Sequence, residues 1–192
     1  SMGARVNGAG GSIITVEGGA ALHGCTHRVI GDRIVCATYL CAAAAAGGEV
    51  RLTGVDYRAV STVALSLAES GCEIRSEADA VSLRSTGALR SVRPVRTAPY
   101  PGFPTDAQPV LMAALLRSEG CTVFVENIFE NRYRHVDELS RMGADITLKP
   151  TGSAGEEPCR TISVSYVEHL HSCEVAGREI ASLVDEIPVL AL

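Results

Sequence analysis

An internal repeat limits the folds open to this chain more than any other feature of its sequence. Gly48 and Gly120 each precede a short apolar run, and Gly71 and Gly143 each precede a second one. Gly120 lies 72 positions after Gly48, and Gly143 lies 72 positions after Gly71. One offset at two independent points predicts two copies of a single structural unit.

The two copies share one predicted order of elements: an apolar helix ending at a glycine, a strand, an amphipathic helix, and two closing strands. In the first copy these elements are helix 34–46, strand 49–53, a helix with apolar positions Val60, Val63, Ala64 and Leu67, and strands 72–75 and 81–84. In the second copy they are helix 106–118, strand 121–126, a helix with apolar positions Val136, Leu139 and Met142, and strands 144–148 and 161–165. This order predicts an α/β fold in which helices pack together behind sheets.

The ends of the chain also resemble parts of the repeat, so we expect a piece of a longer repeat protein or a shortened relative of one. Residues 1–2 are interpreted as the remnant of an expression tag. The predicted organisation is 3–31 as closing strands of a preceding repeat or adjacent domain, 32–102 and 103–182 as repeat units, and 183–192 as the start of a further unit.

Composition excludes several classes of protein. Hydrophobic residues make up 46% and charged residues 20%, which is typical of a globular protein. The net charge of −5 argues against nucleic-acid binding. The longest apolar stretch, Cys36–Ala46, is too short to span a membrane, and no signal peptide opens the chain. We therefore expect a cytoplasmic protein without membrane partners, whose seven cysteines are reduced thiols.

Two groups of metal-ligating residue types alternate along the chain, but neither predicts a metal site. They are His23, Cys25 and His27, and His169, His171 and Cys173. Their spacing matches no standard zinc motif, so we interpret them as partly exposed strand residues. No metal ion or other cofactor is expected.

Two long motifs carry a resemblance to a known family. The runs Thr97–Pro109 and Glu126–Val136, the latter continued by Glu138–Ala144, are similar to the signatures of enolpyruvyl transferases that act on UDP-N-acetylglucosamine. Weaker similarity extends over 3–147. The resemblance implies βαβαββ units arranged as an inside-out α/β barrel domain, which agrees with the repeat.

The resemblance also implies an activity. The whole protein would transfer the enolpyruvyl group of phosphoenolpyruvate to the 3′-hydroxyl of UDP-N-acetylglucosamine, a cytoplasmic step of peptidoglycan precursor synthesis and cell wall biogenesis. It assigns to Asp106 the removal of the hydroxyl proton and a hydrogen bond to the sugar. The local pattern alone leaves open that Asp106 is a helix N-cap, and the two roles are compatible.

Three more residues fall at substrate-binding positions of the family. Ile128 is expected to contact the UDP-sugar through its backbone, or else to be a buried residue at a strand end. Glu130 and Arg132 lie in the loop before the next helix. Arg132 is expected to pair with phosphate or orient Asp106, with a plain surface ion pair as the alternative.

Other readings stay open. The run Glu174–Ala191 resembles 5-enolpyruvylshikimate-3-phosphate synthase, in which Asp185 would be the catalytic carboxylate; the alternative is that Asp185 caps a helix. The family's phosphoenolpyruvate-binding groups find no counterpart here, so the chain alone is expected to turn over no substrate. A non-catalytic module with the same repeat fold is a further alternative. Apolar surface left by a missing unit predicts self-association.

Overall fold

The computed structural model describes residues 1–129, 132–154, 157–184 and 186–192. The chain divides into two units, Ser1–Ile30 and Gly31–Leu192. Both predicted repeats lie in the second unit.

The first unit contains a small antiparallel hairpin of β1 (Arg5–Asn7) and β2 (Thr15–Glu17). A tight turn lies between them, in which the Gly11 N–H donates to the Gly8 carbonyl at 3.0 Å. Gly8 has φ +75°, and a Cβ there would lie 2.2 Å from the Ile13 carbonyl oxygen, so only glycine fits. The strand residues are exposed, and a hairpin of this size buries little apolar surface.

The first repeat forms a three-stranded antiparallel sheet and two helices. Its elements are α1 (Arg33–Ala46), β3 (Gly48–Thr53), α2 (Tyr57–Glu69), β4 (Glu73–Glu77) and β5 (Ala80–Ser85). The sheet order is β3-β5-β4. Gly47 follows α1 with φ +76° and Gly71 follows α2 with φ +112°, conformations that favour glycine.

The second repeat has the same arrangement with one added strand. The added strand is β6 (Val95–Arg96), which lies in the stretch 32–102 assigned to the first repeat but joins the sheet of the second. The other elements are the 3₁₀ helix η1 (Thr105–Ala107), α3 (Gln108–Ala114), β7 (Cys121–Glu126), α4 (Arg134–Arg141), β8 (Asp145–Ala154) and β9 (Glu157–Ser165). The sheet order is β6-β7-β9-β8, with β6 parallel to β7 and the other pairs antiparallel. Short helices α5 (Arg178–Ser182) and α6 (Ile187–Leu190) follow.

The last strand of each repeat lies between the two earlier strands of that repeat: β5 lies between β3 and β4, and β9 lies between β7 and β8. The strands and helices predicted from the repeat are thus confirmed in type and order. The outer bounds assigned to the repeats remain predictions.

One element is shorter than predicted. The sequence predicts a continuous helix over 106–118, but α3 ends at Ala114. The chain leaves the helix because its next segment pairs with an extended one: the Glu119 N–H donates to the Leu89 carbonyl at 2.8 Å, and the Ser91 N–H donates to the Glu119 carbonyl at 2.7 Å. The tertiary pairing therefore overrides the local helical pattern.

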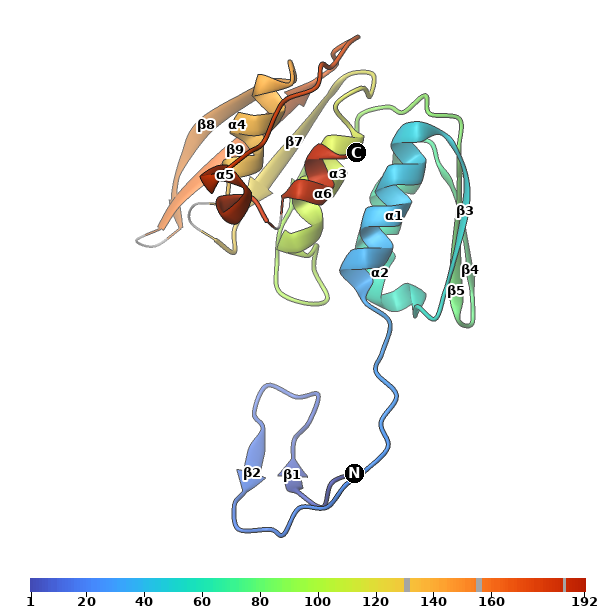
Figure 1. Ribbon diagram of the computed structural model, residues 1–192, viewed down its shortest axis with the longest axis vertical. Coiled ribbons are helices and arrows are strands. Elements are labelled where there is room, and N and C mark those ends of the chain that lie inside the picture. The colour runs from blue at the N-terminus through green and yellow to red at the C-terminus, as the bar shows by residue number, and fades with distance from the viewer. Residues whose placement is uncertain (130–131, 155–156, 185) are drawn as a thin grey trace. The chain divides into compact units, whose positions relative to one another are not determined.

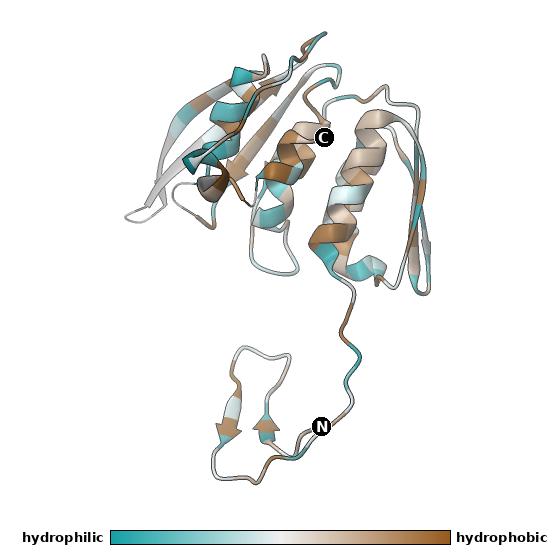
Figure 2. Cartoon of the chain, viewed as in Figure 1, coloured by the Kyte–Doolittle hydropathy of each residue, from teal (hydrophilic) through white to brown (hydrophobic). Residues whose placement is uncertain are grey.

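The helices of the Gly31–Leu192 unit lie between its two sheets, and α1 contacts both α2 and α3 (Figure 1). The apolar colouring of α1 and α3 contrasts with the polar colouring of α4 (Figure 2). Fully buried core side chains come from both repeats and include Leu40, Leu67, Leu111, Phe124, Leu139 and Ile162. Burying each such side chain contributes about 1.5–3 kcal/mol. The prediction that helices pack together behind sheets is confirmed.

Three cysteines are part of this core. Cys36, Cys41 and Cys72 are buried free thiols. Burial raises the pKa of Cys36 to about 11 and raises the pKa of Cys41 further. Thiols held in the protonated form are poor nucleophiles, so Cys36 and Cys41 act as small apolar side chains.

Candidate functional site

Among the described residues, Asp32, Asp56 and Asp106 lie at the starts of α1, α2 and η1, and Asp32 and Asp56 cap their helices. The Asp32 carboxylate accepts from the Ile34 N–H at 2.7 Å and from the Val35 N–H at 3.2 Å, at the start of α1. Asp56 accepts from the Arg58 N–H at 2.9 Å, at the start of α2. Both are ordinary N-caps, because each supplies an acceptor to an unpaired backbone N–H.

Asp106 differs, and the N-cap alternative for it is wrong. In the described part of the chain, neither η1 nor α3 has a side-chain cap: the cap positions are Pro104 and Ala107. Pro109, in the first turn of α3, has no N–H and so reduces the need for a cap. The Asp106 carboxylate instead accepts from Arg132 Nη1 at 2.5 Å. Its side chain is 49% exposed, so solvent or a ligand reaches it.

Arg132 is held from two sides. Its guanidinium pairs with Asp106, and the same group lies over the Phe129 ring, 5.6 Å from the ring centroid. The Arg132 side chain is only 21% exposed. The pair therefore places an anion and a cation side by side, with the carboxylate more open to solvent than the guanidinium.

A buried carboxylate lies next to this pair. Glu126, the last residue of β7, is 2% exposed and accepts four hydrogen bonds. The donors are Thr97 Oγ1 at 2.8 Å, Thr105 Oγ1 at 2.9 Å, the Ile128 N–H at 2.8 Å and the Phe129 N–H at 3.2 Å. No role was predicted for Glu126, Thr97, Thr105 or Phe129, although all four lie within the two motifs.

Ile128 is half-buried just after β7, consistent with the expected position at a strand end. Its N–H is already used by Glu126, so a ligand at this residue is left with the carbonyl oxygen and the side chain. Two other predicted site residues, Glu130 and Asp185, lie outside the described residues.

A buried histidine completes the surroundings of Arg132. His135, in the first turn of α4, is fully buried. Burial, and to a smaller extent the positive charge of Arg132, lower its pKa to about 4. His135 is therefore neutral at pH 7.

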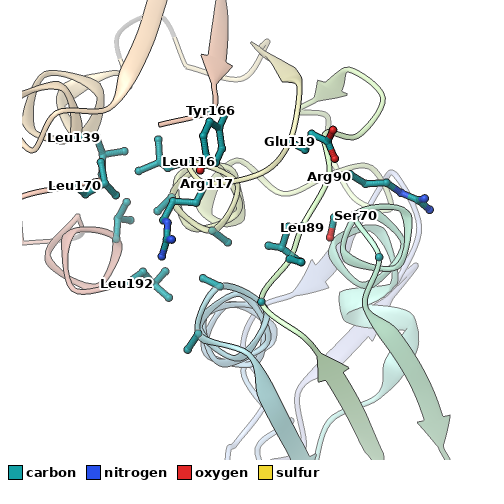
Figure 3. Close-up of a pocket in the computed structure, with 18 of the residues that line it drawn as sticks. Ser70, Leu89, Arg90, Leu116, Arg117, Glu119, Leu139, Tyr166, Leu170 and Leu192 are labelled. Atoms are coloured by element: carbon teal, nitrogen blue, oxygen red, sulfur yellow. The ribbon is translucent and has the colours of Figure 1, made fainter. Parts of the chain in front are cut away.

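A cavity in the second unit lies away from Asp106. It has a volume of about 870 Å³ and is lined by residues at the C-terminal ends of α1 and α3, among them Ala45, Ala114 and Arg117. Leu139 and Leu170 border one part of it, and Arg90 and Glu119 lie across from them (Figure 3). Asp106 is at the other end of α3, about 10 Å along the helix axis. This mostly apolar cavity is not part of the Asp106 site.

Two further findings concern ligands and membranes. Over the described ranges, no three His, Cys, Asp or Glu side chains come together in a way that could hold a metal ion. No described helix combines the length and apolarity needed to cross a membrane.

Comparisons with known proteins agree with this fold. A family model described as EPSP synthase (3-phosphoshikimate 1-carboxyvinyltransferase) matches residues 1–187. The chain is also similar in fold to a solved structure, the enolpyruvyl transferase NikO from Streptomyces tendae, with a TM-score of 0.62 and 23% identity over 99% of this chain and 44% of NikO. The second match confirms the predicted fold class.

Curated relatives are more similar in sequence. The UDP-N-acetylglucosamine 1-carboxyvinyltransferase of Gluconacetobacter diazotrophicus is 52% identical over 147 residues, which cover 77% of this chain and 35% of the relative. The protein of that name from Rhodopseudomonas palustris is 42% identical over 183 residues, covering 95% of this chain and 41% of the relative. The chain thus spans well under half the length of these two relatives.

Proposed function

The chain belongs to the EPSP synthase (3-phosphoshikimate 1-carboxyvinyltransferase) family of enolpyruvyl transferases, and we propose that it is part of an enzyme that uses UDP-N-acetylglucosamine as acceptor. The relatives that are 42–52% identical carry the name of that UDP-sugar. The donor would be phosphoenolpyruvate. The whole protein would then act in the cytoplasm, in peptidoglycan precursor synthesis.

The observation that carries the proposal is the state of Asp106. A carboxylate at a helix start, free of capping, half-exposed and adjacent to a guanidinium, is available to take a proton from a ligand hydroxyl. The sugar oxygen bonds to the enol carbon of phosphoenolpyruvate as its own proton passes to Asp106, and a proton adds to the methylene carbon, which becomes a methyl group in a tetrahedral intermediate. That methyl group then loses a proton as the carbon–oxygen bond to phosphate breaks, so inorganic phosphate leaves and the carbon–carbon double bond is restored.

Arg132 supports this step through charge. Its hydrogen bond to Asp106 orients the carboxylate in the free chain. A guanidinium at this place can also bind the phosphate group of phosphoenolpyruvate, because it donates several hydrogen bonds from a planar fork of N–H groups. Ile128 would contact the UDP-sugar through its carbonyl oxygen, and Glu130 is kept as a proposed substrate-binding residue.

Ligand binding to the chain tests the acceptor. We expect UDP-N-acetylglucosamine to raise the melting temperature of the 192-residue chain more than shikimate 3-phosphate does, because a ligand stabilises the state that it binds. Asp106→Asn should reduce the shift. Asp32→Asn is the matched control, since it alters a helix-start aspartate that only caps.

Each other outcome has a definite meaning. A shift with shikimate 3-phosphate alone would favour the shikimate-using alternative, in which Asp185 is the proposed carboxylate. No shift with either ligand would favour a non-catalytic module. The chain by itself is still expected to turn over no substrate, because most of the family's phosphoenolpyruvate-binding groups find no match in it.

We also propose that the chain associates with itself through apolar surface. Several large apolar side chains of the Gly31–Leu192 unit are exposed, including Val35, Tyr39 and Leu65. The apparent mass in light scattering should therefore rise with protein concentration. A constant monomer mass up to high concentration would contradict this.

A further inference from the structure

A buried carboxylate needs an explanation wherever it occurs, because removing it from water is costly unless its oxygens are fully hydrogen-bonded. Glu126 meets that condition with four donors. These donors come from three segments: the end of β6, the turn before Asp106, and the loop after β7. One side chain therefore ties together three parts of the chain that meet at the candidate site.

The first tie reaches the proposed proton acceptor. Glu126 Oε2 accepts from the hydroxyl of Thr105, the residue directly before Asp106. Holding Thr105 against the end of β7 limits where η1 can place the Asp106 carboxylate. Thr105 is only half-buried, so apolar packing by itself holds this turn less firmly than packing and the hydrogen bond do together.

The second tie reaches the partner of that carboxylate. Glu126 Oε1 accepts from the N–H groups of Ile128 and Phe129, which folds the chain tightly after β7. The Phe129 ring then lies beneath the Arg132 guanidinium, and Arg132 pairs with Asp106. Both members of the ion pair thus depend on segments that Glu126 holds.

The first repeat shows that the strand does not need a carboxylate in order to turn. The position 72 residues before Glu126 is Gly54, which follows β3. There the backbone turns with φ +77°, and the Gly54 N–H donates to the Asp79 carbonyl at 2.8 Å. A glycine suffices for the fold, so the buried glutamate in the second repeat serves something other than the turn.

We infer that Glu126 is a positioning residue, whose buried carboxylate sets the distance between the Asp106–Arg132 pair and the Ile128 backbone that the acceptor sugar would contact. This inference rests on the proposed function for its ligand. The arrangement of the pair itself is measurable without any ligand.

The ligand-free test uses NMR on the full chain. Glu126→Ala removes every tie, and Thr105→Val removes the tie to the Asp106 turn. Glu126→Gln keeps an acceptor oxygen for the two backbone N–H groups and places an NH₂ group against the Thr105 hydroxyl, which can accept. Thr122→Val is the matched control, because the Thr122 hydroxyl is also buried on β7 but accepts from the Val92 N–H at 3.1 Å, away from the site.

Two signals report the position of the groups. In Glu126→Ala, the Ile128 and Phe129 amides should exchange with solvent about tenfold faster or more, because each loses its acceptor. The Arg132 side-chain resonance should move toward its position in Asp106→Asn, where the pair is broken. Thr105→Val should shift the Arg132 resonance alone. Glu126→Gln and Thr122→Val should leave both signals near wild type.

The ligand test measures the Kd for UDP-N-acetylglucosamine by calorimetry on the same variants. Glu126→Ala should weaken binding about tenfold and Thr105→Val about fivefold, whereas Glu126→Gln and Thr122→Val should change it less than twofold. The melting temperatures of Thr105→Val and Thr122→Val should fall by similar amounts, which separates positioning from general destabilisation.

Unchanged amide exchange and an unmoved Arg132 resonance in Glu126→Ala would overturn the inference. The inference would also be overturned if Thr105→Val and Thr122→Val lowered both the melting temperature and the affinity for UDP-N-acetylglucosamine by equal amounts. If the wild-type chain binds no UDP-sugar, the proposed acceptor fails, and the NMR signals alone decide whether Glu126 positions the ion pair.

Discussion

In the first repeat, β3 runs into Gly54 and helix α2 begins at Tyr57, with Asp56 as its cap. In the second repeat, β7 ends at Glu126 and helix α4 begins only at Arg134. The first connection satisfies its polar groups locally, through a glycine turn and a capping aspartate. The second satisfies them through side chains from distant segments, and this difference brings polar side chains together at one place.

The helix starts show the same contrast. The Asp32 carboxylate accepts hydrogen bonds from N–H groups of α1, whereas the Asp106 carboxylate accepts from Arg132, 26 positions further along the chain. Two nearly equivalent positions therefore have different uses. In the second repeat, a carboxylate that does not cap a helix is free to pair with a side chain from another segment, and this pairing forms the candidate site.

The largest expected effect tests Asp106 against Asp32 in an active enzyme. In a chimera of the Gluconacetobacter diazotrophicus relative that carries the matched segment of this chain, Asp106→Asn should lower kcat about 10²–10⁴-fold, because the proton acceptor is lost. Asp32→Asn should change kcat less than about twofold, because asparagine at this position still caps the helix. Release of inorganic phosphate measures both, and equal losses would erase the distinction between the two aspartates.

The next effect concerns a position that differs between the amphipathic helices. Val63 in α2 and His135 in α4 lie 72 positions apart, and both are fully buried. Within the described structure, neither ring nitrogen of His135 has a hydrogen-bond partner. The folded protein therefore disfavours the charged ring, in line with a pKa lowered to about 4 by burial and by Arg132.

The sign of the pH dependence follows from this. Between the ordinary histidine pKa near 6.5 and the lowered value near 4, the unfolded chain binds a proton that the folded chain does not. The stability that comes from keeping His135 neutral is fully present above pH 6.5. As the pH falls to 4, the free energy of unfolding decreases by about 3 kcal/mol. His135→Val should remove this loss. Denaturant unfolding of both proteins at pH 7 and pH 4.5 measures it, and parallel stability curves would contradict the burial of a neutral ring.

The smallest effect compares the two aspartates in stability. Asp32→Ala should lower the free energy of unfolding by about 1 kcal/mol, because two backbone N–H groups lose their acceptor. Asp106→Ala should change it by less than about 0.5 kcal/mol, because a half-exposed ion pair contributes little. Urea unfolding at pH 7 decides between them. A larger loss for Asp106→Ala would mean that its carboxylate serves the fold after all.

Much of the scaffold was predictable because its causes are local. Apolar residues at helical spacing predicted α2 and α4, and glycines marked the ends of these helices at Gly71 and Gly143, where the structure has positive φ. The prediction for α3 ran past Ala114 because pairing of Glu119 with Leu89 and Ser91 joins segments that a local pattern does not relate.

The site divides in the same way. From the two motifs, the family resemblance predicted that Asp106, Ile128 and Arg132 belong to one functional region. The tertiary structure decided what the carboxylates do. Only the packing of the folded chain brings Thr97, next to the β6–β7 pairing, and Thr105, in η1, to Glu126, and brings Arg132 to Asp106. Side-chain hydrogen bonds between distant segments depend on that packing, so a cap and a site residue look alike until the chain has folded.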